Sequence, residues 1–186
     1  MLLKALRMSS KANKKLDMKG FMEAKEFAYK VHRETNHLYG TLPYEYHLNH
    51  AILIGKRFEY LIPLDKKAEI FSAIYLHDTI EDCRVTYGML KDLFGKEIAE
   101  LVFAVTNEKG RYRHDRENDA YFNGIKDTPY ATFVKLCDRI ANIENAIITC
   151  HGMLDKYKSE HARFVEKLYT KEYKEMFEYL EIILTL

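Results

Sequence analysis

The sequence has few of the residues that form turns and cross-links, with 3 prolines, 8 glycines and 3 cysteines in 186 residues. So little proline and glycine leaves few positions for the tight turns of a β-sandwich or barrel, and it favours helices. Cys83, Cys137 and Cys150 are an odd number and show no C-x-x-C spacing. This excludes a disulfide framework and a zinc ribbon, and it predicts a reducing compartment.

The chain also lacks an excess of charge and a long apolar segment. Its 29 Lys and Arg against 28 Asp and Glu give a net charge of +1, so no overall field favours nucleic acid or an anionic membrane. No run approaches the roughly 18 apolar residues of a membrane span. The apolar patch within residues 1–15 is broken by Lys4 and Arg7 and is too short for a signal peptide. We therefore expect a cytoplasmic protein with neither nucleic acid nor a membrane as its partner.

The length and composition predict one globular domain that spans residues 1–186. A chain of this length, with 47% hydrophobic and 31% charged residues, buries roughly two-thirds of its unfolded surface and needs no disulfide or structural metal to fold. We find no internal repeat and no low-complexity linker. Residues 1–15 are compatible with a small helix that packs on the domain or mediates a homodimer.

Apolar residues recur at helical spacing along nearly the whole chain. The expected helices carry Phe21 to Val31; Ala68 to Tyr75, after a cap at Asp65; Thr86 to Gly95, followed by one that runs to about Thr106; Phe133 to Ile147, beginning near Pro129; and Tyr173 to Leu184. An all-α helical bundle is the architecture that these segments predict.

A polar stretch from Asn107 to Asp119 interrupts this pattern. Its cations are Lys109, Arg111, Arg113, His114 and Arg116. Such runs are most often solvated loops. The alternative is a phosphate-binding loop, because several cations beside a backbone turn can share one anion.

The segment from Ile74 to Asp82 gathers an imidazole and three carboxylates within six residues. His77 and Glu81 are four residues apart, as are Asp78 and Asp82. A continuous helix would therefore stack all four on adjoining strips of one face. Their burial needs compensation, which a divalent cation provides, and His with Asp suits Mn, Fe or Zn. The alternative is an exposed helix end.

Two other segments carry residues of the same kind. His47 follows Pro43 and Tyr44 and sits just inside an expected helix whose apolar partners are Ala51 and Ile54. Asp138 lies between Val134 and Ala141 on one stripe of the long helix. A carboxylate among such neighbours is either a ligand or is buried and paired with Lys135 or Arg139.

Taken in order, these motifs resemble the HD metal-dependent phosphohydrolases. The matching segments are Pro43-Tyr44-x-x-His47, Leu76 to Asp82, Phe94-Gly95, Val105-Thr106 and Val134 to Asn142. Within that superfamily the chain is most similar to the alarmone hydrolase domain of the bifunctional stringent-response enzymes and their small stand-alone relatives. The resemblance covers about residues 21–146. It implies the HD-domain helical bundle, with residues 147–186 as C-terminal helices packed on it.

The resemblance implies a site and a reaction. Carried over residue by residue, it makes His47, His77, Asp78 and Asp138 the ligands of one divalent cation, typically Mn²⁺, with other transition metals as alternatives. Glu81 and Asp82 match the acidic pair that positions or activates the attacking water, and Asn142 matches a substrate contact. Relatives place basic phosphate contacts where Arg111 and Arg113 fall. The implied reaction removes pyrophosphate from the 3′ position of a small nucleotide such as ppGpp.

The chain departs from that pattern where substrate is recognised. Leu38 and Tyr39 replace a basic pair that packs on the guanine base, and a stack of the base on Tyr39 or His37 is the alternative. Glu144 and Asn145 stand where relatives often have Arg-Thr, and a carboxylate there is unfavourable beside a polyphosphate unless it faces away. These departures leave two alternatives open. One is an HD phosphatase for a 5′-monophosphate or the 2′-phosphate of NADPH, and the other is a non-catalytic nucleotide-binding module.

Overall fold

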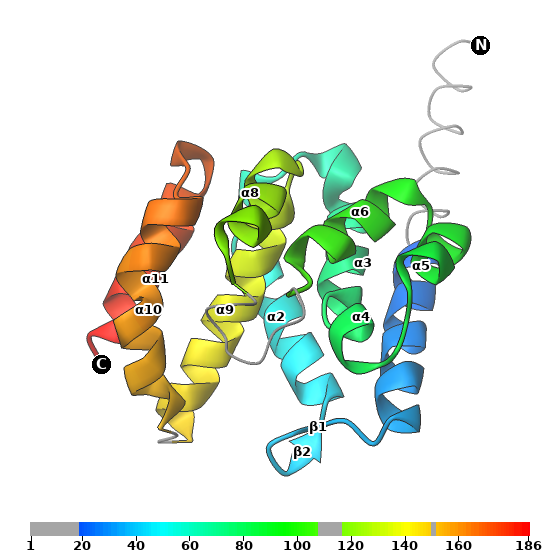
Figure 1. The fold of residues 1–186 in the computed structure, drawn as a ribbon, viewed down its shortest axis with the longest axis horizontal. Coiled ribbons are helices and arrows are strands. Elements are labelled where there is room, and N and C mark those ends of the chain that lie inside the picture. The colour runs from blue at the N-terminus through cyan, green and yellow to red at the C-terminus, as the bar shows by residue number, and fades with distance from the viewer. Residues whose placement is uncertain (1–18, 108–116, 150–151) are drawn as a thin grey trace, which may run out of the picture.

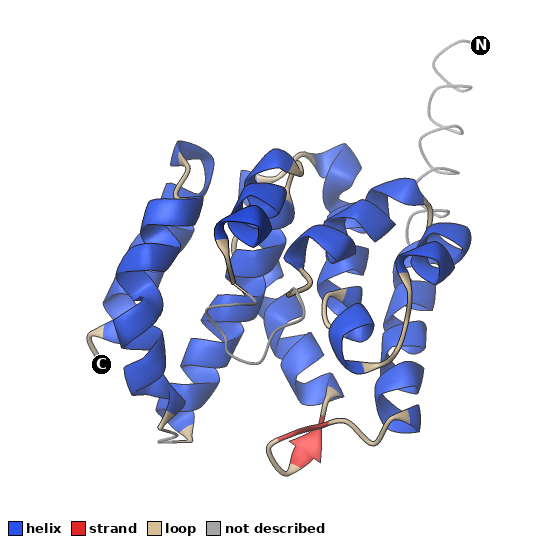
Figure 2. Cartoon of the chain, in the orientation of Figure 1, coloured by secondary structure: helices blue, strands red, loops and turns tan. Residues whose placement is uncertain are grey.

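The computed structural model describes residues 19–107, 117–149 and 152–186, and most of them are helical (Figures 1 and 2). This confirms the predicted all-α fold. The first helix covers residues 19–34 of the described chain. The elements that follow are β1 (Leu38–Tyr39), β2 (Leu42–Pro43), α2 (Glu45–Arg57), α3 (Lys67–Leu76), α4 (Thr79–Asp82), α5 (Tyr87–Phe94), α6 (Lys96–Val105), α8 (Asp119–Asp127), α9 (Ala131–Ile148), α10 (Met153–Leu168) and α11 (Lys174–Leu184).

The central element is α9. It packs against α2, α3, α6 and α8, which precede it in the chain, and against α10 and α11, which follow it. Its side chains Phe133, Leu136, Ile140 and Ile143 are fully buried. Burial of each such side chain contributes about 1.5–3 kcal/mol. Because α9 touches both the early and the late helices, a polar residue on its inner face meets side chains from distant parts of the sequence.

Both boundaries of α5 agree with the sequence, whereas the start of α3 does not. The Thr86 side chain accepts a hydrogen bond from the Met89 N–H at the start of α5, and Gly95 ends that helix with a φ of 90°. The cap predicted at Asp65 is wrong. That residue lies in a short 3₁₀ turn, Leu64–Lys66, and α3 begins after Lys66 without a side-chain cap.

The predicted continuous helix through residues 74–82 is also wrong, because α3 ends at Leu76 and α4 begins at Thr79. His77 Nδ1 lies 2.7 Å from the Ile74 carbonyl oxygen, and the Thr79 hydroxyl donates to the Leu76 carbonyl at 2.7 Å. Both side chains thus bond carbonyls of the last turn of α3, in competition with the helix. His77 and Asp78 form the turn between α3 and α4, and their side chains point into the interior.

Two close approaches position the site. At Gly55 in α2 a Cβ atom would lie 2.9 Å from Ile74 Cδ1, so a larger residue would require the Ile74 side chain to shift where α2 crosses α3. The hairpin of β1 and β2, which the helical spacing did not predict, pairs Tyr39 with Leu42 ahead of α2. Within the described residues, no helix has the length and apolar character of a membrane span.

Candidate metal centre

Four side chains from three segments converge on one point in the interior. His47 comes from α2, His77 and Asp78 from the turn after α3, and Asp138 from α9. The His47 and His77 Nε2 atoms are 3.1 Å apart. Asp138 Oδ1 lies 3.4 Å from His47 Nε2 and 3.6 Å from His77 Nε2. Asp78 Oδ2 lies 2.8 Å from His77 Nε2 and 3.6 Å from His47 Nε2.

The donor set fits a transition-metal cation. Ligand atoms of His47, His77 and Asp78 all lie within 4.8 Å of one another, and Asp138 faces the same two imidazoles. Two imidazole nitrogens that face each other at 3.1 Å repel unless a proton or a cation lies between them. Two imidazoles with two carboxylates suit Mn, Fe or Zn.

Surrounding hydrogen bonds hold the ligand atoms in place, as the groups around metal ligands commonly do. The Ile74 carbonyl faces His77 Nδ1. This contact keeps the imidazole proton on Nδ1 and directs the Nε2 lone pair to the centre. The Tyr44 hydroxyl donates to Asp78 Oδ2. The Asn142 amide donates to Asp138 Oδ1 at 2.5 Å.

Lys135 pairs with Asp138, which confirms the interpretation of a buried and paired carboxylate, and the ligand interpretation stays a prediction. Lys135 Nζ donates to Asp138 Oδ2 at 2.9 Å, whereas Oδ1 faces the two histidines. Burial would raise the pKa of Asp138, but Lys135 and the two histidines hold that pKa well below its usual range. The carboxylate is therefore ionised and contributes negative charge to the centre.

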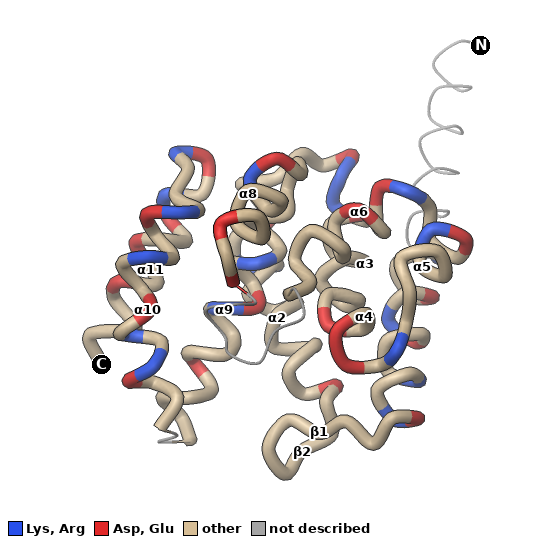
Figure 3. Tube along the Cα trace, in the orientation of Figure 1, with Lys and Arg blue, Asp and Glu red and all other residues tan. Residues whose placement is uncertain are grey.

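A cavity of about 160 Å³ opens beside these ligands. It is lined by Tyr44, Asp78, Glu81, Asp82, Asn107, Glu117, Lys135, Asp138, Arg139, Asn142 and Tyr157. The predicted acidic pair, Glu81 and Asp82, thus shares one cavity with two of the predicted ligands. Figure 3 shows acidic positions on α4, whereas acidic and basic positions are interspersed along α10 and α11.

The two acids have different surroundings. The Asn107 side-chain amide donates to both Glu81 oxygens, at 3.0 and 3.2 Å, and the Asn107 backbone N–H approaches Glu81 at 3.4 Å. Asp82 Oδ2 lies 3.7 Å from His37 Nδ1. Burial raises the pKa of Asp82 to about 7, and the charges of Asp78 and Glu81 add to that rise.

Asn142 and Tyr39 meet at the edge of the centre. The Tyr39 hydroxyl donates to Asn142 Oδ1 at 2.7 Å, and the Tyr39 ring stacks on His47 with centroids 4.8 Å apart. Tyr39 therefore contacts both a predicted ligand and a predicted substrate residue. Its neighbour Leu38 is exposed.

Glu144 faces away from the cavity. Its carboxylate lies 2.6 Å from His50 Nε2 and accepts from Arg57 at 2.9 Å and from the Tyr179 hydroxyl at 2.6 Å. These partners belong to α2 and α11, so Glu144 ties α9 to both helices. The sequence requires a carboxylate at this position to face away from a polyphosphate, and Glu144 does so.

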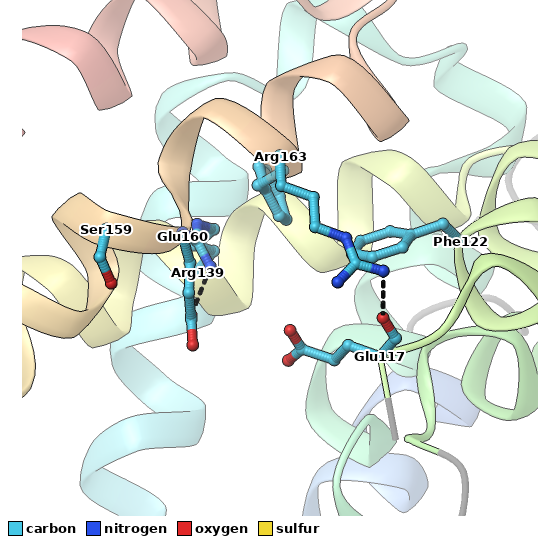
Figure 4. A pocket seen from close by; sticks show the side chains of 7 residues that line it. Glu117, Phe122, Arg139, Ser159, Glu160 and Arg163 are labelled. Carbon is cyan, nitrogen blue, oxygen red and sulfur yellow. Dashed lines mark hydrogen bonds and ion pairs between the residues drawn. The ribbon is translucent and has the colours of Figure 1, made fainter. Parts of the chain in front are cut away.

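A second cavity adjoins the first, because Glu117 and Arg139 line both. Figure 4 shows Arg163 donating to the Glu117 carbonyl beside the Phe122 ring, and Glu160 near Arg139. Arg139 is buried with its guanidinium 4.2 Å from the Phe164 ring centroid. Sequence reasoning did not assign Tyr44 or Tyr157 to the site. It named Lys135 as a candidate partner of Asp138, three residues away on one helix face, and the hydrogen bond between the two confirms that pairing.

The predicted phosphate contacts Arg111 and Arg113 lie outside the described residues, together with Lys109, His114 and Arg116.

Comparison with known proteins gives relatives whose names share a ppGpp hydrolase activity. No protein-family model matches the chain. It is 30% identical over 126 residues to guanosine-3′,5′-bis(diphosphate) 3′-pyrophosphohydrolase MESH1 of Danio rerio, covering 67% of each chain. It is 32% identical over 126 residues to the guanosine-3′,5′-bis(diphosphate) 3′-pyrophosphohydrolase of Aquifex aeolicus, covering 65% of this chain and 17% of that protein. It is 35% identical over 81 residues to the bifunctional (p)ppGpp synthase/hydrolase SpoT of Escherichia coli, covering 40% of this chain and 12% of that protein.

Proposed function

We propose that this chain, which belongs to the family of guanosine-3′,5′-bis(diphosphate) 3′-pyrophosphohydrolases, removes the 3′-pyrophosphate from ppGpp or a closely related alarmone. The observation that carries the proposal is the convergence of His47, His77, Asp78 and Asp138 beside a cavity that also holds Glu81 and Asp82. These six residues are the set that the HD resemblance assigns to metal-assisted phosphate hydrolysis.

We assign the four inner residues as ligands of one divalent cation, with Mn²⁺ as our proposal for its identity. Two carboxylates weight the set toward hard ions, and the two imidazoles also admit Fe or Zn. When bound, such a cation lowers the pKa of water and polarises a phosphoryl oxygen. The Tyr44 and Asn142 hydrogen bonds would keep the two carboxylates aimed at it.

The acidic pair would receive the proton of the attacking water. Glu81 and Asp82 both line the cavity, and a carboxylate one hydrogen bond from the water can accept its proton. The Asn107 amide fixes the orientation of Glu81. Lys135, which also lines the cavity, would offset part of the negative charge that the substrate brings.

Substrate recognition is assigned to the rim of the site. Tyr39 presents an aromatic ring beside His47, and its bond to Asn142 places both residues where a nucleotide would approach the centre. Base stacking on an aromatic side chain is a common mode of nucleotide recognition. We assign the more distant phosphates to Arg111 and Arg113, on the ground of the family resemblance.

One observation favours a second candidate, an HD phosphatase acting on another nucleotide. Burial lowers the pKa of His37, and the next residues are the uncharged Leu38 and Tyr39. At neutral pH these three residues supply no cationic side chain to pack on a guanine base, which leaves the base preference open to adenine. The substrate in this candidate is a 5′-monophosphate or the 2′-phosphate of NADPH.

A substrate panel separates the two candidates. The Mn²⁺-loaded protein would be given ppGpp, ppApp, NADPH and GMP, with Asp78→Ala as the blank. The proposed function predicts pyrophosphate from ppGpp or ppApp. Orthophosphate from NADPH or GMP alone would replace it with the second candidate.

We further propose that residues 1–186 form one domain that works in the cytoplasm on a small-molecule substrate. The packing of α10 and α11 on α9 supports the single domain. A homodimer through residues 1–15 stays a prediction, and that segment lies outside the described residues.

A further inference from the structure

A second cluster of metal-binding side chains lies next to Tyr44 and consists of His32, His37 and Cys83. His32 Nδ1 is 3.0 Å from His37 Nδ1 and 3.2 Å from Cys83 Sγ. One ligand atom from each residue falls within 4.8 Å of the others. His32 and Cys83 are buried, and His37 is half-buried. None of the three belongs to the proposed catalytic centre.

The three residues come from separate segments. His32 lies in the last turn of the first helix, His37 just before β1, and Cys83 directly after α4. The Tyr44 ring stacks on both imidazoles, with centroids 4.2 Å from His32 and 4.1 Å from His37 and interplanar angles of 17° and 22°. The two imidazoles thus lie side by side on one aromatic face, with their Nδ1 atoms directed at each other.

Hydrogen bonds among these three side chains cannot satisfy all of their polar atoms. An imidazole nitrogen carries either one proton or one lone pair in the ring plane, so His32 Nδ1 can make one good bond and not two. Yet both His37 Nδ1 and Cys83 Sγ approach it within 3.2 Å. The other ring nitrogen, His32 Nε2, is buried and has no hydrogen-bond partner among the described residues. Both polar contacts described for the His32 ring are therefore made by Nδ1, the atom that His37 and Cys83 approach.

We propose that His32, His37 and Cys83 bind a Zn²⁺ ion, separately from the cation of the His47 centre. Two imidazole nitrogens and a thiolate are the donors that Zn²⁺ prefers, and a thiolate disfavours Mn²⁺. Zn–N bonds of about 2.0 Å and a Zn–S bond of about 2.3 Å require His32 Nδ1 to move away from His37 Nδ1 and from Cys83 Sγ by only a few tenths of an ångström. On binding, the Cys83 thiol gives its proton to solvent, and the thiolate forms the bond to zinc.

Three protein ligands leave a fourth position, which the Asp82 carboxylate borders, 3.7 Å from His37 Nδ1. The ion would hold the end of the first helix, the entry to the β1–β2 hairpin and the end of α4 together. It would also fix the imidazoles that support the Tyr44 ring, whose hydroxyl bonds Asp78. The zinc site would therefore be structural, and it does not depend on the proposed hydrolase activity.

Cobalt is the probe that separates the two sites, because a Co²⁺–thiolate bond gives a charge-transfer band in the near ultraviolet. The chelator-stripped full-length chain would be titrated with Co²⁺ under a phosphine reductant, with bound metal counted per chain. We expect about two equivalents in the wild type, with the thiolate band present. Cys83→Ser should lose the band and about one equivalent, whereas Asp138→Ala should keep the band and lose the other equivalent.

Two further variants keep the test decisive. His37→Ala removes a half-exposed ligand without emptying a core position, and it should weaken the band. Cys150→Ser makes the same chemical change as Cys83→Ser, and its titration should match the wild type. The proposal fails if the folded wild type shows no thiolate band. It also fails if the band survives in Cys83→Ser, since another cysteine would then be its source.

Discussion

The Lys135 ammonium and the Asp138 carboxylate form a buried ion pair on one turn of α9, with Nζ 2.9 Å from Oδ2, while Oδ1 of the same carboxylate faces His47 and His77. The two oxygens of Asp138 therefore have separate partners. Lys135 neutralises Oδ2, and Oδ1 is directed at the proposed cation. Both partners compensate the same buried charge, so the loss of one should increase the dependence on the other.

Lys135→Met should destabilise the metal-free protein by about 3 kcal/mol, because it leaves the Asp138 charge buried without its partner. Added Mn²⁺ should recover more stability in this variant than in the wild type, since the cation then supplies all of the compensation. Urea unfolding with and without Mn²⁺ measures both effects. Lys126→Met, at an exposed position of α8, is the matched control. Equal gains from Mn²⁺ in Lys135→Met and the wild type would argue against Asp138 as a ligand.

Asp138→Ala should lose bound metal and hydrolytic activity together, because it removes one carboxylate from the ligand set. Metal content by elemental analysis and the rate of ppGpp hydrolysis are measured on the same sample. Asp92→Ala replaces an exposed aspartate of α5 and should change neither. If Asp138→Ala keeps full activity, the ligand assignment is wrong.

Glu81→Gln should keep the metal and lower kcat by about 100-fold or more, because an amide cannot accept the proton of the attacking water. The Asn107 contacts hold Glu81 at the cavity without involving the proposed ligands, so metal content should stay at the wild-type level. Glu97→Gln, on the exposed side of α6, serves as the control. Normal turnover in Glu81→Gln would move the proton-accepting role to Asp82, which Asp82→Asn then tests.

Glu144 should make stability depend on pH in the acid range. Its hydrogen bonds from His50, Tyr179 and Arg57 outweigh the effect of burial and lower its pKa from 4.5 to about 2. A lowered folded-state pKa adds stability above pH 4.5, and this contribution is lost as the pH falls toward 2. With allowance for solvent screening, the contribution is roughly 2 kcal/mol.

Urea unfolding at several pH values between 2 and 6 compares the wild type with Glu144→Gln. The variant should be less stable at pH 6, and the difference should shrink as the pH falls. A difference that stays constant with pH would show that the carboxylate charge contributes nothing.

The residues of the centre could be predicted because each one lies in a local pattern. His47, His77, Asp78 and Asp138 each stand beside apolar residues at helical spacing, and the order of the motifs gave the family. The Thr86 and Gly95 helix boundaries were predictable for the same reason, since caps act within one turn.

Features that depend on distant partners were not predictable. The Glu144 carboxylate faces away because Arg57 and Tyr179, 87 and 35 residues distant in sequence, reach it after folding. The helix breaks at His77, where the imidazole ring bonds the Ile74 carbonyl. Helical spacing of the sequence fits a break there as well as a continuous helix. His32, His37 and Cys83 show no ligand spacing in the sequence, and only the packing around Tyr44 brings them together.

The most direct test of the proposed catalytic centre is the product that the Mn²⁺-loaded protein releases from ppGpp, measured beside Asp78→Ala. We expect pyrophosphate together with GDP from the wild type, and neither product from the variant. Pyrophosphate release that is equal in Asp78→Ala, or none from the metal-loaded wild type on either ppGpp or ppApp, would contradict it.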